Sequence, residues 1–275
     1  MKRNKLIPNF IMEKEVIIMK KNILRIVLCT VLCLVTYWSA FALTADEILD
    51  KIEAKRSINT TQKSIGKMTL TDEKGKQEIR DLVMYSVDDS ENTQNRAFIF
   101  RFLSPAEVKN VTMLSLKDGD EIYLYMPAFK KVRRIAGSSK KEKFAGTNFS
   151  FGDFGGGYAK DDYESSLVSE DEQTYVLDLK PNDTDTDYSK LTMTVDKEKF
   201  YFKKIEFFDL DGNPWKVLEI QEVKEETDGS ITIMKLTFTD LKDNTKSFLQ
   251  MESVEKGVNL AKDFFSVRTI QRPQL

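Results

Sequence analysis

The residues that most often carry out catalysis are scarce in this chain of 275 residues. It contains no histidine, which excludes histidine-based triads, dyads and zinc sites built from its own residues. Its two cysteines, Cys29 and Cys33, lie in one N-terminal apolar segment, so we expect no disulfide framework and no thiol chemistry in the rest of the chain. Carboxylates are plentiful, but no spacing selects one pair for acid–base catalysis. We therefore expect a protein that is not an enzyme and that needs no cofactor and no metal.

Two segments bear a partial similarity to ligand-binding loops. Residues 183–187 have the acidic spacing of the start of a calcium loop, but Tyr188 replaces the glycine of the turn and Thr194 replaces the bidentate glutamate. The glycines at positions 152, 155, 156 and 157 match neither phosphate-binding spacing. We interpret the first segment as a polar turn and the second as the hinges of a mobile cover.

The N-terminus has the three parts of an export signal. Basic residues at 20, 21 and 25 precede an apolar segment, residues 26–36, and Ala40-Phe41-Ala42 supplies a cleavage site. We predict that residues 1–42 form a signal peptide that starts at Met19 and is cleaved near Ala42, which makes the protein periplasmic. The alternative is an uncleaved anchor, because residues 26–43 carry no charge. Leucine precedes each cysteine, so lipidation is not expected.

Removing residues 1–42 takes away seven basic and two acidic residues, which changes the formal charge from −2 to −7. An acidic chain of this kind is a poor candidate for nucleic-acid binding.

The remaining sequence predicts one helix followed by a long antiparallel sheet. Thr44 and Glu47 form a capping box, so a helix is expected over residues 45–56. Turn signals separate thirteen β-rich segments, and none of the connections is a helix long enough for a parallel crossover. The segments are 60–71, 76–87, 94–103, 111–117, 120–126, 131–135, 161–168, 173–180, 189–196, 200–209, 215–223, 231–240 and 246–254.

Alternation within these segments indicates a curved sheet with an apolar concave face. The cover for that face is expected from residues 136–159, the longest stretch without strand alternation. We predict that an apolar ligand contacts Phe149 and Phe151 on the cover. On the strands we predict contacts from Phe98, Phe100, Phe102, Leu114, Leu116, Met193, Met234 and Leu236.

A cluster of basic residues occupies positions 130–143. It predicts a surface that docks on an anionic membrane or an acidic partner. The residues assigned to it are Arg133, Arg134, Lys140, Lys141 and Lys143, with the two arginines on opposite faces of their strand. The alternative is a solvated hairpin and loop.

Residues 125–135 (YMPAFKKVRRI) and 144–154 (FAGTNFSFGDF) resemble two motifs of the outer-membrane lipoprotein-sorting family, the LolA-like periplasmic carriers. The resemblance covers residues 43–275 and implies a single domain, an incomplete antiparallel β-barrel with an N-terminal helix and a helix and loop cover. It also implies binding of acyl chains of lipoproteins or lipids, which a monomer moves toward the outer membrane. An inner-membrane export transporter and an outer-membrane acceptor would then be its partners. Gly152 departs from the family, which more often has an acidic residue there.

An apolar cavity suits that role on physical grounds. Two sixteen-carbon chains lose about 25 kcal/mol of favourable free energy of burial on leaving a membrane, at about 0.8 kcal/mol per methylene. The free energy of binding to a carrier must nearly match this loss. Phenylalanine, leucine and isoleucine supply such a lining, and methionine adapts to different shapes. The alternative function is that of an envelope-stress sensor of the RseB type, in which the same fold signals to a protein partner.

Overall fold

The computed structural model describes Met19 and residues 43–56, 60–89, 92–154, 158, 160–183 and 186–275. The predicted signal peptide, residues 1–42, therefore lies outside the described residues except for Met19. The chain divides into two units, Met1–Leu43 and Thr44–Leu275, and the second contains every strand. No helix in the described ranges is long and apolar enough to span a bilayer.

Helix α2 (Ala45–Arg56) begins at the predicted capping box. The Thr44 backbone N–H donates to Glu47 Oε2 over 2.8 Å, and the Glu47 N–H donates to Thr44 Oγ1 over 3.2 Å. These bonds satisfy two donors that the first helical turn leaves free. Ile48 and Leu49 are buried on one side of the helix, so α2 packs as an amphipathic helix.

The thirteen predicted strands are all present, with ends shifted by at most three residues. They are β1 (Thr60–Thr71), β2 (Gln77–Asp88), β3 (Ala97–Phe102), β4 (Thr112–Leu116), β5 (Glu121–Met126), β6 (Lys131–Ile135), β7 (Tyr163–Glu170), β8 (Thr174–Pro181), β9 (Lys190–Asp196), β10 (Phe202–Phe208), β11 (Pro214–Glu225), β12 (Ile231–Asp240) and β13 (Thr245–Lys256). Short 3₁₀ helices connect some of them: η1 (Thr93–Asn95), η2 (Lys117–Gly119), η3 (Pro127–Phe129), η4 (Gly137–Lys141), η5 (Phe144–Gly146), η6 (Gly152–Phe154) and η7 (Lys160–Asp162).

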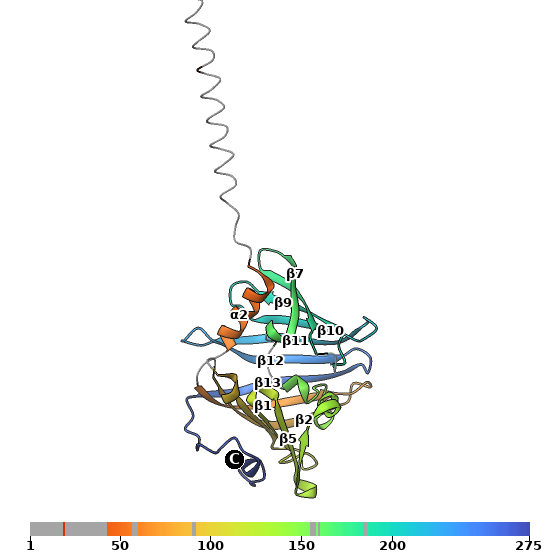
Figure 1. Ribbon diagram of the computed structural model, residues 1–275. Coiled ribbons are helices and arrows are strands. Elements are labelled where there is room, and N and C mark those ends of the chain that lie inside the picture. Colours follow the sequence, from red (N-terminus) through yellow and green to blue (C-terminus); the bar gives the residue numbers. More distant parts are fainter. Residues whose placement is uncertain are drawn as a thin grey trace, which may run out of the picture. The chain divides into compact units, whose positions relative to one another are not determined.

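All strands belong to one antiparallel sheet in the order β6-β5-β4-β3-β2-β1-β13-β12-β11-β10-β9-β8-β7. The sheet is not closed into a barrel, because β6 and β7 are the two ends of this order (Figure 1). The predicted fold class, a mainly β half-barrel with few helices, is confirmed.

The register assigns each strand residue to one of two faces, since directly opposite residues in an antiparallel pair point the same way. Phe100 lies opposite Met84 and Met113, whereas Ile99 lies opposite Tyr85 and Leu114. The face that carries Phe100 is called the inner face here, and the face that carries Ile99 is the outer face.

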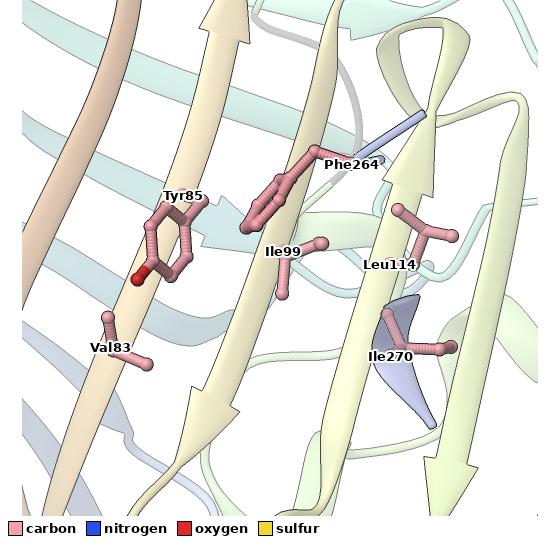
Figure 2. Packing of buried hydrophobic residues seen from close by; sticks show 6 residues of the cluster. All are labelled: Val83, Tyr85, Ile99, Leu114, Phe264 and Ile270. Atoms are coloured by element: carbon pink, nitrogen blue, oxygen red, sulfur yellow. The ribbon is translucent and has the colours of Figure 1, made fainter. Parts of the chain in front are cut away.

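The C-terminal segment covers part of the outer face. Phe264 and Ile270, the latter in helix α3 (Val267–Ile270), pack on a cluster of strand residues (Figure 2). The strand residues of this cluster are Val83, Tyr85, Ile99 and Leu114.

Arg101 holds the C-terminal segment in place on the outer face. Its side chain is 1% exposed. It donates to the backbone oxygens of Ile270 and Arg272 over 2.8 and 2.9 Å, and to Thr112 Oγ1 over 2.8 Å. Three donors of one guanidinium are thereby satisfied, which offsets the cost of burying its charge.

Candidate functional site

The inner face is an almost continuous apolar surface that extends across the sheet from β5 to β8. One row of opposed residues runs through Phe238, Leu218, Ile205, Met193 and Leu177 on neighbouring strands. At the other end of the sheet, Phe100, Met113 and Leu124 form a similar row. All eight of these side chains are buried. The sheet itself lies on only one side of them. Other elements must therefore cover this face.

Residues 137–154, called the cover here, lie on the inner face and include η4, η5 and η6. The Phe144 ring stacks on Phe102 at a centroid distance of 5.6 Å and meets Phe100 edge-on at 5.3 Å. Phe149 lies 5.0 Å from Phe238, on the opposite side of the inner face. Rings from the cover thus fill the space over strands that are far apart in the sheet. The position of the predicted cover is confirmed for residues 137–154, while residues 155–157 and 159 lie outside the described part.

Hydrogen bonds anchor the middle of the cover. Asn148 Nδ2 donates to the Phe238 and Thr245 backbone oxygens over 3.2 and 2.8 Å, and the Asn148 N–H donates to Ser247 Oγ over 2.9 Å. On the other side, Arg80 Nη1 donates to the Ala145 backbone oxygen over 2.7 Å. Residues 145–148 are therefore attached both to the β12–β13 hairpin and to β2.

Lysines of the cover form a further set of contacts. Lys143 pairs with Asp240 at 3.1 Å and with Asp243 at 2.5 Å. Lys141 pairs with Asp187 at 3.4 Å, and Lys140 Nζ donates to the Gly119 backbone oxygen over 3.0 Å. These contacts connect the cover to turns on both sides of the inner face.

Helix α2 contacts β7 and β12 and is attached to turns and strand ends of the sheet. Lys55 Nζ donates to the Gly229 backbone oxygen over 2.9 Å in the β11–β12 turn. Glu53 pairs with the buried Arg96, which also pairs with Asp88 and Asp118 at 2.8 and 3.0 Å. Burial raises the pKa of Asp88. The helix is thereby connected to both halves of the sheet.

Half-buried apolar side chains remain on the inner face at several strands. They include flexible methionines, which adapt their shape to a neighbour. Phe154, at the end of the cover, is also half-buried, and its ring lies parallel to Phe98 at 6.0 Å. The half-buried strand residues on this face are Met84, Phe98, Ile220, Met234, Leu236 and Met251.

Eight of the ten predicted ligand-contacting residues lie at the inner face or in the cover. They are Phe98, Phe100, Phe102, Met193, Met234, Leu236, Phe149 and Phe151. Whether they contact a ligand stays a prediction.

The prediction that Leu114 and Leu116 share a face with Phe100 is wrong. In the β3–β4 register Phe100 lies opposite Met113, while Leu114 and Leu116 lie opposite Ile99 and Ala97 on the outer face. Both faces of β4 carry apolar residues because the C-terminal segment buries the outer one. Alternation alone therefore could not identify Met113 as the residue that shares a face with the phenylalanines.

Four of the five predicted docking residues form contacts within the protein. Lys140, Lys141 and Lys143 are occupied by the contacts described above, and Arg133 pairs with Glu142 at 2.7 Å. Arg134 lies opposite Tyr123 and Arg133 lies opposite Leu124, so the two arginines do point to opposite faces, as predicted. The three lysines connect separate parts of the molecule. The density of charge in a short stretch of sequence could not reveal these connections.

A cavity of about 430 Å³ with a mixed polar and apolar lining lies beside the cover. Lys216, which is buried, donates to Tyr188 Oη over 3.0 Å at its wall. Burial raises the pKa of Tyr163, another wall residue, to about 12, so its phenol stays neutral at physiological pH. In the part of the chain that the structure describes, no three carboxylate side chains are grouped closely enough to hold a metal ion. Of the calcium-like segment, Thr184 and Asp185 lie outside the described residues.

Three of the solved structures that have a similar fold are the following. An outer membrane lipoprotein-sorting protein domain from Vibrio parahaemolyticus has a TM-score of 0.77 and 21% identity, and the match covers 83% of this chain and 98% of that one. A DUF1329 family protein from Desulfovibrio piger has a TM-score of 0.74 and 21% identity, with 82% and 97% covered. A LolA superfamily protein from Nitrosomonas europaea has a TM-score of 0.65 and 20% identity, with 82% and 99% covered.

The sequence comparisons add a family. The model of a family described as "-like: Uncharacterized protein" matches residues 94–272, about two thirds of the chain. No curated protein sequence matches. The chain belongs to the family that this model describes, and its fold is the LolA-like fold of outer membrane lipoprotein-sorting proteins.

Proposed function

We propose that the protein binds acyl chains of lipoproteins or lipids on the inner face of its sheet and carries them through the periplasm toward the outer membrane. The observation that carries this proposal is the kind of cover that the inner face has. An irregular segment, rather than a second sheet, packs on the apolar residues of the inner face, with ring contacts to β3 and β12. Such a segment can move without disrupting the strand ladder.

The phenylalanines of the cover mark where an acyl chain would lie. Phe154 contacts both Phe144 and Phe149, and each of the three contacts strand phenylalanines, at ring distances of 5.0 to 6.0 Å. An acyl chain that displaced part of this cover would keep the strand residues out of water. The exchange replaces one apolar contact with another, so the free energy of burial is largely preserved.

Phe154 and its neighbours are the part of the cover from which we expect displacement to begin. Phe154 is half-buried, whereas Phe144 is fully buried. The Asn148 hydrogen bonds anchor the middle of the cover, and Phe154 lies six residues beyond them. The lining consists mainly of hydrocarbon and aromatic side chains, which favours binding without a chemical step.

Native mass spectrometry of protein purified without detergent tests this function. We expect bound species with the masses of acylated molecules, together with uptake of a fluorescent fatty acid. Phe100→Leu should change the preference between short and long chains, because it alters the shape of the inner face. The control is Phe208→Leu, since Phe208 is half-buried opposite Lys190 on the outer face. Absence of bound acyl species and of uptake would reject the proposal.

The transfer role requires partners, which we propose to be an inner-membrane export transporter and an outer-membrane acceptor. A pulldown from envelope extracts separates this role from the regulatory alternative. Capture of a transporter or acceptor supports transfer, whereas capture of an anti-sigma factor indicates a regulator of the RseB type. Either outcome is compatible with acyl-chain binding, so the two questions are tested separately.

A further inference from the structure

The β5–β6 hairpin ends in an exposed aromatic side chain. Phe129, the last residue of η3, is 69% exposed, a value matched in the described part of the chain only by Leu210 among large hydrophobic residues. The turn is well defined, because Pro127 begins η3 and the Lys130 N–H donates to the Pro127 oxygen over 3.1 Å. The backbone therefore presents Phe129 to solvent in a fixed position. A single exposed apolar residue is common and would not by itself indicate a binding surface.

Basic residues follow Phe129 directly. Positions 130, 131, 133 and 134 are all Lys or Arg, in a chain whose formal charge is −2. Lys130, Lys131 and Arg134 are exposed, and none of them forms an ion pair with a residue that the structure describes. Four positive charges and one exposed ring are thus concentrated at one hairpin.

Protection of a sheet edge explains only part of this arrangement. Strand β6 is an end of the sheet, and charged residues on an edge strand discourage pairing with other molecules. That accounts for Lys131, Arg133 and Arg134. It does not account for Phe129 and Lys130, which precede the strand, because an exposed phenylalanine makes an edge more prone to association.

We propose that this hairpin tip, consisting of Phe129, Lys130 and Lys131, docks the protein on an anionic lipid bilayer. Phe129 enters the boundary between headgroups and acyl chains, and the two lysines contact lipid phosphates. An aromatic ring flanked by lysines has the two properties that interfacial anchors combine, apolar insertion and attraction to anionic lipid. Lysine stems also lie along apolar surface while the ammonium group stays at the phosphates. Phe129 and Lys130 lie in the turn beyond the last paired residues of β5 and β6, Met126 and Lys131, so the docking proposal does not depend on acyl-chain binding.

Vesicle cosedimentation tests the proposal with the purified protein. The probes are vesicles of phosphatidylcholine with and without phosphatidylglycerol, at low and high salt. We expect binding to the vesicles with phosphatidylglycerol that weakens as salt rises. Phe129→Ser should weaken it about tenfold, because the inserted ring is lost. Lys130→Gln with Lys131→Gln should weaken it about 25-fold, at roughly fivefold per charge.

Matched variants separate docking from general effects. Leu210→Ser removes an equally exposed apolar residue from the β10–β11 turn, and Lys74→Gln with Lys76→Gln removes two exposed charges from the β1–β2 turn. Both should leave vesicle binding within about twofold of wild type. Any contribution from the N-terminal apolar segment is the same in all variants and cancels.

Tryptophan fluorescence gives a direct readout of insertion. Phe129→Trp should show a blue-shifted emission with phosphatidylglycerol vesicles, relative to the parent protein with Trp38 and Trp215. An unchanged emission, or vesicle binding by Phe129→Ser equal to that of wild type, would overturn the proposal. A loss of binding in the Leu210→Ser control equal to that in Phe129→Ser would also overturn it.

Discussion

The ring of Phe144 lies parallel to that of Phe102, with centroids 5.6 Å apart and planes inclined by 14°. The two residues belong to the cover and to strand β3, and neither has any exposed surface. Arg80 lies over the Phe102 ring at 5.1 Å and donates to the Ala145 backbone oxygen. The same small region therefore combines stacking, a cation–π contact and a hydrogen bond, which together attach the cover to the sheet.

Phe144→Ala should destabilise the protein by about 3 to 5 kcal/mol, because it removes a fully buried ring and leaves a cavity. Urea unfolding measures the loss. Phe129→Ala is the control, since Phe129 is exposed and its removal should change stability by less than about 0.5 kcal/mol. Equal effects of the two changes would show that Phe144 is not part of the core.

Phe154→Ala should increase the rate of fatty-acid uptake. Its ring is half-buried and covers Phe98 and Phe100, so its removal opens a path to the inner face at a cost of about 1 to 2 kcal/mol. Stopped-flow fluorescence measures the uptake rate. Phe208→Ala on the outer face should leave the rate unchanged. A slower rate in Phe154→Ala would mean that this ring does not obstruct entry to the inner face.

Lys143→Gln should loosen the cover in a pH-dependent way. Lys143 lowers the pKa of Asp243 by hydrogen bonding and by its charge. A lowered carboxyl pKa in the folded state adds stability that is complete above the unfolded pKa of about 3.9 and is lost as the pH falls through the lower, folded value. Hydrogen exchange in residues 143–149 should therefore be roughly twofold to tenfold faster in the variant at neutral pH.

The same measurement at acidic pH provides the contrast. At a pH low enough to protonate both carboxyl partners of Lys143, the wild type and Lys143→Gln should exchange at similar rates, because neither then has an ion pair at this position. The exposed Lys109→Gln serves as the control at each pH. A difference between wild type and Lys143→Gln that persisted unchanged at low pH would exclude the carboxyl pairing as its cause.

Arg101→Lys should release the C-terminal segment from the outer face. Lysine cannot reproduce the donors that reach Ile270, Arg272 and Thr112 together. We expect a loss of about 2 to 3 kcal/mol and faster proteolysis within residues 260–275. Arg268→Lys, at an exposed position of α3, should behave like wild type. Unaltered proteolysis of Arg101→Lys would show that apolar packing alone holds the segment.

Local sequence patterns predicted the strands of the sheet. They did not predict which segments pack on each of its two faces. Turn signals and alternation act over a few residues, so all thirteen strands could be located. The face of Leu114 depends on Phe264 and Ile270, which are distant in sequence and cover an apolar surface as suitable as the inner one. Charge density at Lys143 likewise suggested docking, whereas its partner Asp243 lies 100 residues away. Contacts at that separation leave no local signal in a single sequence.

The central claim, that acyl chains lie on the inner face, is tested most directly by photo-crosslinking with a fatty acid that carries a diazirine near its terminal methyl group. After irradiation, mass spectrometry of peptides locates the attached residues. We predict attachment to inner-face residues of β3, β12 and the cover, with Phe98, Leu236 and Phe154 the nearest to a chain that displaces the cover. Attachment confined to the outer face, around Phe264 and Leu114, or no attachment competed by unlabelled fatty acid, would contradict the account.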